Sequence, residues 1–282
     1  MSEEIITSRQ NPSVKFLCSL EQKKYRVENG MFRFDGIKLY REAAECGVET
    51  VNIYLNASKY PVIAERAGIT IKDKSRVILL SEDIFNRVSG EISPEGIITV
   101  AKYLDKSHKI ATINNKGKFT VLPARDESII LLEVIRDPGN LGTVIRSAAA
   151  LGIDRMIITS DCADIYNTKT IRAAMGALFR QKITIVNPGD IAEYISDLRA
   201  TGRRVLAAAL RAGAAELGEF ELFDGDCFVI GNEGHGLSDR AIEACDMSVI
   251  IPMEKGCESL NAAMAATLCI WETRRAGTRC RK

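Results

Sequence analysis

The C-terminal half of the chain alternates between short apolar runs and longer segments in which apolar residues recur every three or four positions. A short apolar run is typical of a buried strand, and the longer spacing is typical of a helix. Strands are predicted at 129–135, 155–160, 182–186, 203–210, 227–231 and 247–253, and helices at 140–151, 168–179, 190–202 and 258–274. This alternation predicts a parallel sheet covered by helices on both faces.

The N-terminal half has shorter elements and predicts a separate, smaller α/β domain. Strands are expected at 30–34, 49–55, 75–81 and 95–103, and helices at 11–26, 35–47, 58–68 and 82–89. Residues 104–125 carry charge, Asn-Asn and Lys-Gly-Lys, which is typical of a linker with room for one strand. The predicted organisation is a small domain at 1–105, a linker at 106–125 and a larger domain at 126–282.

Composition and charge narrow the function classes only a little. Of the 282 residues, 46% are hydrophobic, which suffices for two buried cores, and the net charge of +1 gives no overall attraction to nucleic acid or membrane. Basic side chains gather at 5–26 and in the last ten residues, either as solvated termini or as arms that contact phosphates. No stretch reaches the roughly 18 apolar residues that a membrane helix needs.

The cysteines and histidines disfavour several kinds of site. None of the eight cysteines forms a C-x-x-C pair and several lie in apolar runs, so we expect free thiols in a reducing cytosol. With only His108 and His235 available, a Cys/His zinc site is disfavoured and no metal is expected. A Ser-His-Asp hydrolase is also disfavoured, because the chain lacks the G-x-S-x-G sequence.

Unusual polar residues follow the first strand of the larger domain, and ligands of parallel sheets collect beyond the carboxyl ends of strands. In EVIRDPGNLGTVIRSAAALGI, residues 133–153, Asn140 occupies the expected place of a helix N-cap. Arg146 follows among small and apolar residues, next to a face expected to be packed. Because an unpaired buried guanidinium is costly, Arg146 needs either a structural ion pair or an anion in an open cleft.

Two further strand ends carry polar and small residues. FVIGNEGHGLS at 228–238 lacks the spacing of a Rossmann fingerprint or a P-loop, and its glycines indicate either backbone pressed against a flat ligand or a tight turn before a helix capped by Ser238. In VIIPMEKGCESLNAAMAATLCIWE at 249–272, Ser259 and Asn261 begin a helix of small residues. Only one of them can cap that helix, which leaves a spare polar group.

Together these segments resemble the three signature motifs of the SpoU (TrmH-like) RNA 2′-O-ribose methyltransferases. Residues 140–146 match N-x-G-x-x-x-R, 231–238 match G-N-E-x-x-G-L-S, and 251–265 match I-P-M…S-L-N-V-S-x-A. TIRAAMGALF at 170–179 is similar to the family's R-A-S-x-G-A segment. FRFDGIKLYREA at 32–43 is similar to a pattern in the ribosomal-protein-like domain that precedes the catalytic domain in many members.

The chain departs from the family pattern at a few positions. Ala262 and Ala263 stand where Val-Ser is usual, Ala174 replaces a serine, and Asp35 replaces a glutamate. The missing hydroxyls bear on capping or on one RNA contact, while the polar residues that the family uses for chemistry remain.

The resemblance implies an α/β fold of the SPOUT superfamily. The C-terminal domain would be a knotted parallel sheet, with its last segment threaded through a loop as a trefoil knot, preceded by a small α/β RNA-binding domain. The resemblance also implies S-adenosyl-L-methionine as methyl donor. The residues implied to hold the donor are Gly231, Asn232, Ile251, Met253 and Leu260.

The resemblance further implies roles on the RNA side. Arg146 would engage the ribose 2′-hydroxyl or its phosphate, and Asn140, Glu233 and Asn261 would shape the catalytic pocket. Arg172 and Ser259 would contact RNA. Members of the family act as homodimers, and a cytoplasmic homodimer is expected here.

The substrate and even the activity stay open at this point. A separate N-terminal domain with basic ends favours a structured RNA, and ribosomal RNA over transfer RNA. One alternative is a transfer RNA ribose methyltransferase, and another is a non-catalytic ribosome- or RNA-binding protein on the same fold, which the alanines of the third motif motivate. Methylation of a base is disfavoured by the arginine of the first motif.

Overall fold

The computed structural model describes residues 4–69, 74–115, 117–223, 225–232, 234–254, 256 and 259–280. The chain divides into two compact units. One contains residues 1–104 together with 164–179, and the other contains 105–163 together with 180–282. Residues 164–179 therefore group with the N-terminal unit, although they follow a strand of the C-terminal unit along the chain.

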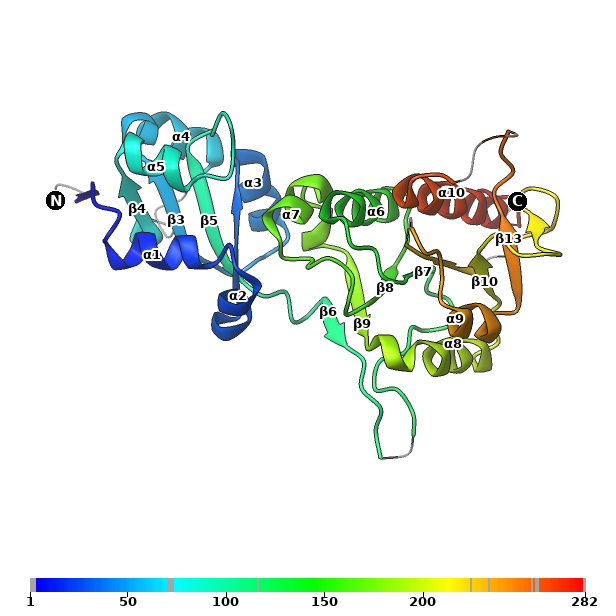
Figure 1. The fold of residues 1–282 in the computed structure, drawn as a ribbon. Coiled ribbons are helices and arrows are strands. Elements are labelled where there is room, and N and C mark those ends of the chain that lie inside the picture. The colour runs from blue at the N-terminus through cyan, green and yellow to red at the C-terminus, as the bar shows by residue number, and fades with distance from the viewer. Residues whose placement is uncertain are drawn as a thin grey trace. The chain divides into compact units, whose positions relative to one another are not determined.

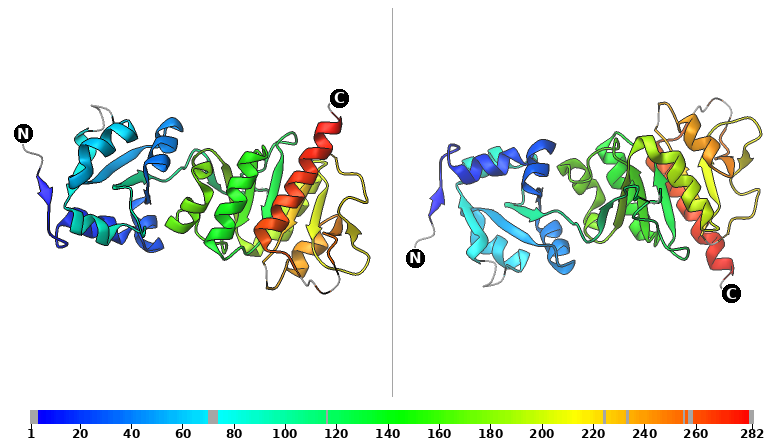
Figure 2. Two further views of the ribbon diagram at one scale, coloured as in Figure 1. Left: turned by 90° about the horizontal axis from the view of Figure 1, so that it is seen from above. Right: turned by 90° about the horizontal axis from the view of Figure 1, so that it is seen from below.

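The N-terminal unit is built on a mixed sheet with strand order β1-β4-β3-β5-β2. Its strands are β1 (Ile5–Ile6), β2 (Met31–Asp35), β3 (Thr50–Asn56), β4 (Val77–Leu80) and β5 (Ile97–Lys102). Its α-helices are α1 (Pro12–Ser19), α2 (Lys23–Asn29), α3 (Ile37–Glu45), α4 (Tyr60–Ala67), α5 (Glu82–Val88) and α7 (Thr168–Ala174). Helices α1 and α5 cover one face of the sheet, and α3 and α4 cover the other (Figure 2).

The single helix predicted over 11–26 is wrong, because the chain turns between α1 and α2. Backbone amides of Glu21 and Gln22 donate to carbonyls three residues back, which is a turn geometry. The buried Arg26 donates to the carbonyl of Leu20 and pairs with Asp164 at 2.5 Å. A helix that continued straight would not let this side chain reach both partners, so tertiary contacts decide the break.

The helix predicted over 168–179 is also too long. Helix α7 ends at Ala174, and the next two residues, Met175 and Gly176, have φ of +49° and +85°. A Cβ at Gly176 would lie 3.0 Å from the side chain of Glu42, so glycine is needed there. Around this segment the ring of Tyr166 stacks on Tyr103 at 4.1 Å between centroids, which anchors it in the N-terminal unit.

The C-terminal unit contains an eight-stranded sheet in which every pairing is parallel, as the sequence predicted. The order is β11-β13-β10-β12-β7-β8-β9-β6. The strands are β6 (His108–Ile110), β7 (Ile129–Leu132), β8 (Arg155–Thr159), β9 (Lys182–Val186), β10 (Val205–Ala208), β11 (Ala215–Glu216), β12 (Cys227–Ile230) and β13 (Met247–Ile250). The segment expected to be a linker thus supplies β6 at one edge.

Helices cover both faces of this sheet. They are α6 (Pro138–Ala150), α8 (Ile191–Ala200), α9 (Asp239–Ala244) and α10 (Ala262–Cys280). Helices α6 and α10 lie side by side on one face, and α8 and α9 lie on the other (Figure 1). Residues of β7 alternate accordingly, with Ile129 and Leu131 in the cluster under α8 and α9.

A carboxylate joins the amino ends of the central strands. Glu127 precedes β7 and accepts hydrogen bonds from Arg155 at 3.0 and 3.1 Å and from Lys182 at 2.9 Å. Burial opposes ionisation of Glu127, but the hydrogen bonds from the two cations outweigh it and lower the pKa to about 2. This cluster lies at the end of the strands away from the motifs that begin after them, so its role is structural.

Candidate active site

The first motif follows β7 and begins α6. The N-cap of α6 is Asp137, not Asn140 as expected, because the Asp137 side chain accepts a hydrogen bond from the Asn140 amide at 2.8 Å. Pro138 occupies the first helical position, where its fixed φ suits the helix and its missing N–H is no loss. Asn140 therefore lies inside the first turn, and its side-chain amide is not used as the cap.

The third motif begins α10 beside the start of α6. Asn261 caps α10, since its Oδ1 accepts from the amides of Ala263 at 3.0 Å and Met264 at 3.3 Å. Its Nδ2 donates to Oδ1 of Asn140 at 3.0 Å. Two predicted catalytic residues are thus in contact, and the capping question left open by the sequence is decided in favour of Asn261.

Arg146 lies on an exposed face of α6. Thr143 and Ala150, three and four residues away on the same face, are exposed as well, while Ile145 is buried. The guanidinium makes no ion pair or hydrogen bond with any residue that the structure describes. The sequence left two alternatives for Arg146, a structural ion pair or an anion bound in an open cleft. The exposed position favours the bound anion.

The second motif forms a closed loop at the end of β12. The backbones of Asn232 and Gly236 exchange two hydrogen bonds, of 3.1 and 2.9 Å. A Cβ on Gly231 would lie 2.4 Å from the carbonyl group of Gly236, so only glycine allows this closure. Ser238 caps α9 through a hydrogen bond from the Ala241 amide, as one of the two interpretations of the sequence predicted. Glu233, predicted to be catalytic, lies outside the described residues.

The end of β7 is held in an unusual conformation next to this loop. Val134 has φ of +59°, which is rare for a β-branched residue. Nδ2 of Asn232 donates to the Val134 carbonyl at 3.0 Å, and the Val134 amide donates to the buried Thr159 hydroxyl at 3.0 Å. The Asn232 side chain therefore holds the backbone that leads to the first motif, a contact that sequence reasoning missed because it depends on the positive φ of Val134.

A hollow of about 840 Å³ opens at the carboxyl ends of β10 and β13. Ile251, Met253 and Leu260, all expected to hold the donor, line it, and so does Ser259, expected to contact RNA. Gly231 and Asn232 do not line it; they lie in the loop after the neighbouring strand β12.

Several residues of this hollow were not predicted. They are Ala208, Ala209 and Leu210 at the end of β10, Glu216 on β11, and Glu254. The rule that ligands gather at strand carboxyl ends could have identified the small residues after β10, but not the pairing of β11 beside β13. Cys269 also lines the hollow, and burial raises the pKa of its thiol to about 12, so the thiol stays neutral.

The residues present suit a nucleoside-based donor. A mostly apolar hollow of this size is typical of small-molecule sites, and the apolar side chains of Ile251 and Leu260 provide walls for a flat base. Asn261, next to Leu260 in the chain, connects this hollow to Asn140 and so to α6. A hydrogen bond therefore links the residue that follows Leu260 to the first motif.

Residues 127–271 match the SpoU rRNA Methylase family. The chain belongs to that family. Residues 11–99 match the MRM3-like substrate binding domain. The first match lies in the C-terminal half of the chain and the second in the N-terminal half.

Relatives within the SpoU family span nearly the whole chain. The 23S rRNA (guanosine(2553)-2′-O)-methyltransferase RlmP of Bacillus subtilis is 30% identical over 281 residues, 95% of this chain and 98% of the relative. A 23S rRNA (uridine(2479)-2′-O)-methyltransferase of Streptomyces viridochromogenes is 29% identical over 278 residues, 95% of this chain and 90% of the relative. The AdoMet-bound structure of an rRNA methyltransferase from Sinorhizobium meliloti aligns with TM-score 0.78 and 27% identity, over 96% of this chain and 97% of that one.

These findings confirm the family, the fold class, and the expectation of an S-adenosylmethionine-dependent RNA methyltransferase. Cys18, Cys46, Cys162, Cys227, Cys245 and Cys269 are free thiols. Among the described residues, no helix has the length and apolarity to cross a membrane.

The N-terminal unit of this SpoU protein contains Arg172, one of the two residues expected to contact RNA. The Arg172 guanidinium on α7 donates to the carbonyl of Gly90 at 3.1 Å and lies 3.8 Å from Glu91. Desolvation by burial raises the pKa of Glu91, with the charge of Asp35 adding to it, while Arg172 acts in the opposite direction. Arg172 is thus half-exposed and held in place by contacts within the N-terminal unit.

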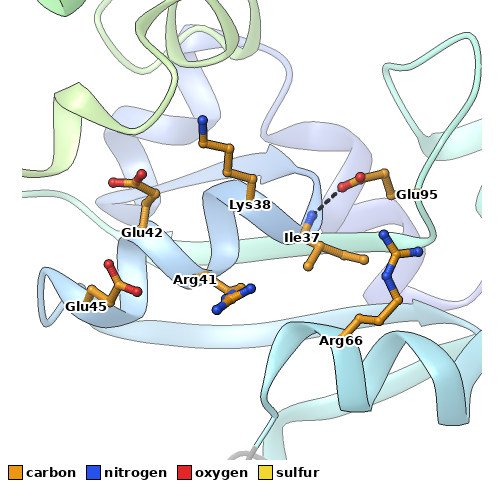
Figure 3. A pocket seen from close by; sticks show the side chains of 7 residues that line it. All are labelled: Ile37, Lys38, Arg41, Glu42, Glu45, Arg66 and Glu95. Carbon is orange, nitrogen blue, oxygen red and sulfur yellow. Dashed lines mark hydrogen bonds between the residues drawn. The ribbon is translucent and has the colours of Figure 1, made fainter.

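A second, smaller hollow of about 280 Å³ lies between α3 and α4 (Figure 3). Glu95 accepts a hydrogen bond from the Ile37 amide at 2.6 Å and so caps the start of α3. The guanidinium groups of Arg41 and Arg66 face the space between the two helices (Figure 3). Neither arginine forms an ion pair with a residue in the described ranges, which leaves both able to meet an anion.

Proposed function

We propose that this SpoU methyltransferase acts on a ribose 2′-oxygen of ribosomal RNA from the large ribosomal subunit. Both relatives named above carry that activity in their names, and each aligns over 95% of the chain. The observation that carries the proposal for this chain is the contact between Asn140 and Asn261, which joins the donor hollow to the helix that bears Arg146. This contact brings residues of the first and third motifs together beside the hollow, as transfer from a donor to a bound ribose requires.

The chemistry assigns distinct tasks to the residues. S-adenosylmethionine, when bound, supplies a methyl group made electrophilic by the adjoining sulfonium. The ribose hydroxyl is a poor nucleophile, so it must be oriented in line with the bond that breaks and must lose its proton. An arginine side chain has donors and no acceptor, so Arg146 does not take that proton, but its fork of donors fits a phosphate.

In the proposed reaction Arg146 binds the phosphate beside the target ribose and holds the 2′-hydroxyl toward the donor hollow. A bond forms between the 2′-oxygen and the methyl carbon as the carbon–sulfur bond breaks, and a phosphate oxygen takes the hydroxyl proton. Asn140 and Asn261 fix α6 and α10 relative to one another during this step. Glu233 is assigned to the same pocket by its place in the second motif.

RNA recognition is assigned to two groups of side chains. Arg172 and Ser259 keep the roles implied by the family pattern, and Ser259, which lines the hollow, is assigned to the nucleotide next to the donor. Arg41 and Arg66 are available for backbone phosphates in the N-terminal unit. Phosphate contacts of this kind supply affinity and register rather than sequence specificity.

The assembly proposed is a homodimer in the cytoplasm. Met264, Leu268 and Trp271 are spaced by four and three residues on α10 and are 58%, 40% and 52% exposed. Such spacing places them on one helix face, and a row of large exposed apolar side chains is typical of an interaction surface. The free cysteines fit a reducing compartment.

Methyl transfer from tritiated S-adenosylmethionine to ribosomal RNA lacking the modification tests the proposal. Because a 2′-O-methyl group blocks alkaline cleavage of the adjoining phosphodiester, labelled product should appear as an alkali-resistant dinucleotide from the large-subunit RNA. Label in transfer RNA instead would show that transfer RNA, and not ribosomal RNA, is the substrate. Donor and RNA binding without transfer would favour a non-catalytic RNA-binding protein.

A further inference from the structure

The donor hollow has an uneven charge. Glu216 and Glu254 are the only charged residues in the described part of its lining. The other lining residues are apolar or uncharged, and the Cys269 thiol is neutral because burial raises its pKa. The hollow therefore presents two carboxylates and no cation among the described residues to whatever fills it.

The backbone of Glu216 is fixed on both sides of the residue. In the pairing of β11 with β13, Glu216 lies opposite Ile250. The Leu217 amide donates to the Ile250 carbonyl at 2.8 Å, and the Glu219 amide donates to the Glu216 carbonyl at 3.1 Å. Glu254, by contrast, lies in the irregular segment after β13.

The cation that lies closest to Glu216 in the sequence has another partner. Arg211, in the same connection as β11, is paired with Asp239. Among the described residues neither Glu216 nor Glu254 has an ion-pair partner. An unpaired carboxylate on a fixed strand at the wall of a ligand hollow favours a cationic ligand, because each unit charge at contact distance adds attraction that water screens only in part.

The donor and the product of this reaction differ in charge. S-adenosylmethionine carries a sulfonium, an ammonium and a carboxylate, so its net charge is positive. S-adenosylhomocysteine lacks the sulfonium and is neutral overall. Since both contain the same adenosine, the apolar walls formed by residues such as Ile251 and Leu260 cannot distinguish them.

We propose that Glu216, with Glu254 in support, selects the cationic donor over the neutral product. The inference rests on the assignment of this hollow to the donor in the proposed function. Loss of the sulfonium charge during transfer removes the attraction, so the product leaves more readily than the donor. Glu216 is a specificity-determining residue, and it does not take part in bond making.

Calorimetric titration of Glu216→Gln with three ligands tests this. The substitution should lower the affinity for S-adenosylmethionine about three- to tenfold, as expected for one partly solvated charge pair, and leave the affinity for S-adenosylhomocysteine unchanged. Sinefungin carries an ammonium in place of the sulfonium, so the variant should lose affinity for it as it does for the donor. Raising the salt concentration should reduce the wild-type preference for the two cationic ligands and affect Glu216→Gln less.

The matched control is Glu219→Gln, which removes an equal charge from the same connection outside the lining of the hollow. It should bind all three ligands as the wild type does. Unchanged binding of S-adenosylhomocysteine also shows that Glu216→Gln is folded. Glu216→Lys should lower the affinity for the donor further than Glu216→Gln does. It should then bind S-adenosylhomocysteine more tightly than the two cationic ligands.

Three outcomes have distinct meanings. If Glu216→Gln weakens all three ligands alike, Glu216 only supports the shape of the hollow and the inference is wrong. If it weakens none, charge selection does not come from this residue and the inference is equally wrong. If the wild type binds none of the three ligands, the assignment of the donor site fails and the inference falls with it.

Discussion

The side chain of Asn261 donates from Nδ2 to Oδ1 of Asn140 at 3.0 Å, across 121 positions of sequence. Each residue also has a local tie: the Asn140 amide is held by Asp137, and Oδ1 of Asn261 caps α10. A few residues further along, the Thr267 hydroxyl donates to Ser147 at 3.0 Å. The starts of α6 and α10 are therefore fixed to one another by polar contacts on top of apolar packing.

Asn261→Asp should separate the cap from the contact with Asn140. Aspartate keeps a cap acceptor for the amides of Ala263 and Met264, but it cannot donate to Asn140. Methyl transfer should fall about tenfold or more, with a smaller loss of unfolding temperature than Asn261→Ala causes. In a double-mutant cycle with Asn140→Ala, independent effects on transfer would contradict the proposed coupling.

Arg146→Ala should abolish most methyl transfer while S-adenosylmethionine still binds. The exposed guanidinium is proposed to hold the substrate phosphate, and loss of such positioning costs on the order of 100-fold. Arg146→Lys is the matched variant, since it keeps the charge and loses the planar fork; it should retain more RNA affinity than activity. Transfer by Arg146→Ala at near wild-type rates would rule out this role.

Gly231→Ala should open the loop of the second motif. The added Cβ would lie 2.4 Å from the Gly236 carbonyl, where backbone has to move, so the pair between Asn232 and Gly236 cannot persist. The free energy of unfolding should be about 2 kcal/mol lower than in the wild type, and the affinity for the donor should fall. In Gly234→Ala, in the same loop, the added Cβ would lie 3.3 Å from the Asn232 side chain and meet no other described residue, so this variant should be milder in both measurements.

The cluster around Glu127 should make stability fall at acid pH. The pKa of Glu127 is lowered from 4.5 to about 2 in the folded protein, so its contribution is present above the unfolded pKa and is lost as pH falls from about 4.5 toward 2. Glu127→Gln should therefore destabilise the protein at pH 7, by on the order of 1–2 kcal/mol, and by much less near pH 2.5. Denaturant titrations at both pH values measure this, and an equal loss at the two would contradict it.

Leu268→Glu should convert a dimer into monomers. The substitution places a charge in the middle of the exposed apolar face of α10, between Met264 and Trp271. Light scattering measures the mass directly. Val62→Glu is the control, because Val62 is 59% exposed on α4 and lies outside that face. A wild type that is monomeric at all concentrations tested would remove the dimer from the proposal.

Local sequence signals identified most of the elements, and they failed where distant contacts intervene. Six of the eight strands of the larger sheet were predicted, because each of them is a short apolar run, whereas the two-residue β11 was missed. The break after Leu20 was missed because it depends on Arg26 reaching Asp164, which lies 138 positions away. The cap of α6 was assigned to Asn140 rather than Asp137, since both residue types favour caps and only backbone geometry distinguishes them.

The sequence by itself determined the parallel α/β architecture, the residues of the three motifs and, through them, the family. These are properties of residue type and spacing, which periodicity and short patterns record directly. Only the tertiary structure decided that Asn140 meets Asn261, that β11 brings Glu216 to the hollow at the ends of β10 and β13, and that Arg146 is exposed. Such pairings depend on which strands and helices become neighbours, and spacing along one chain does not encode that order locally.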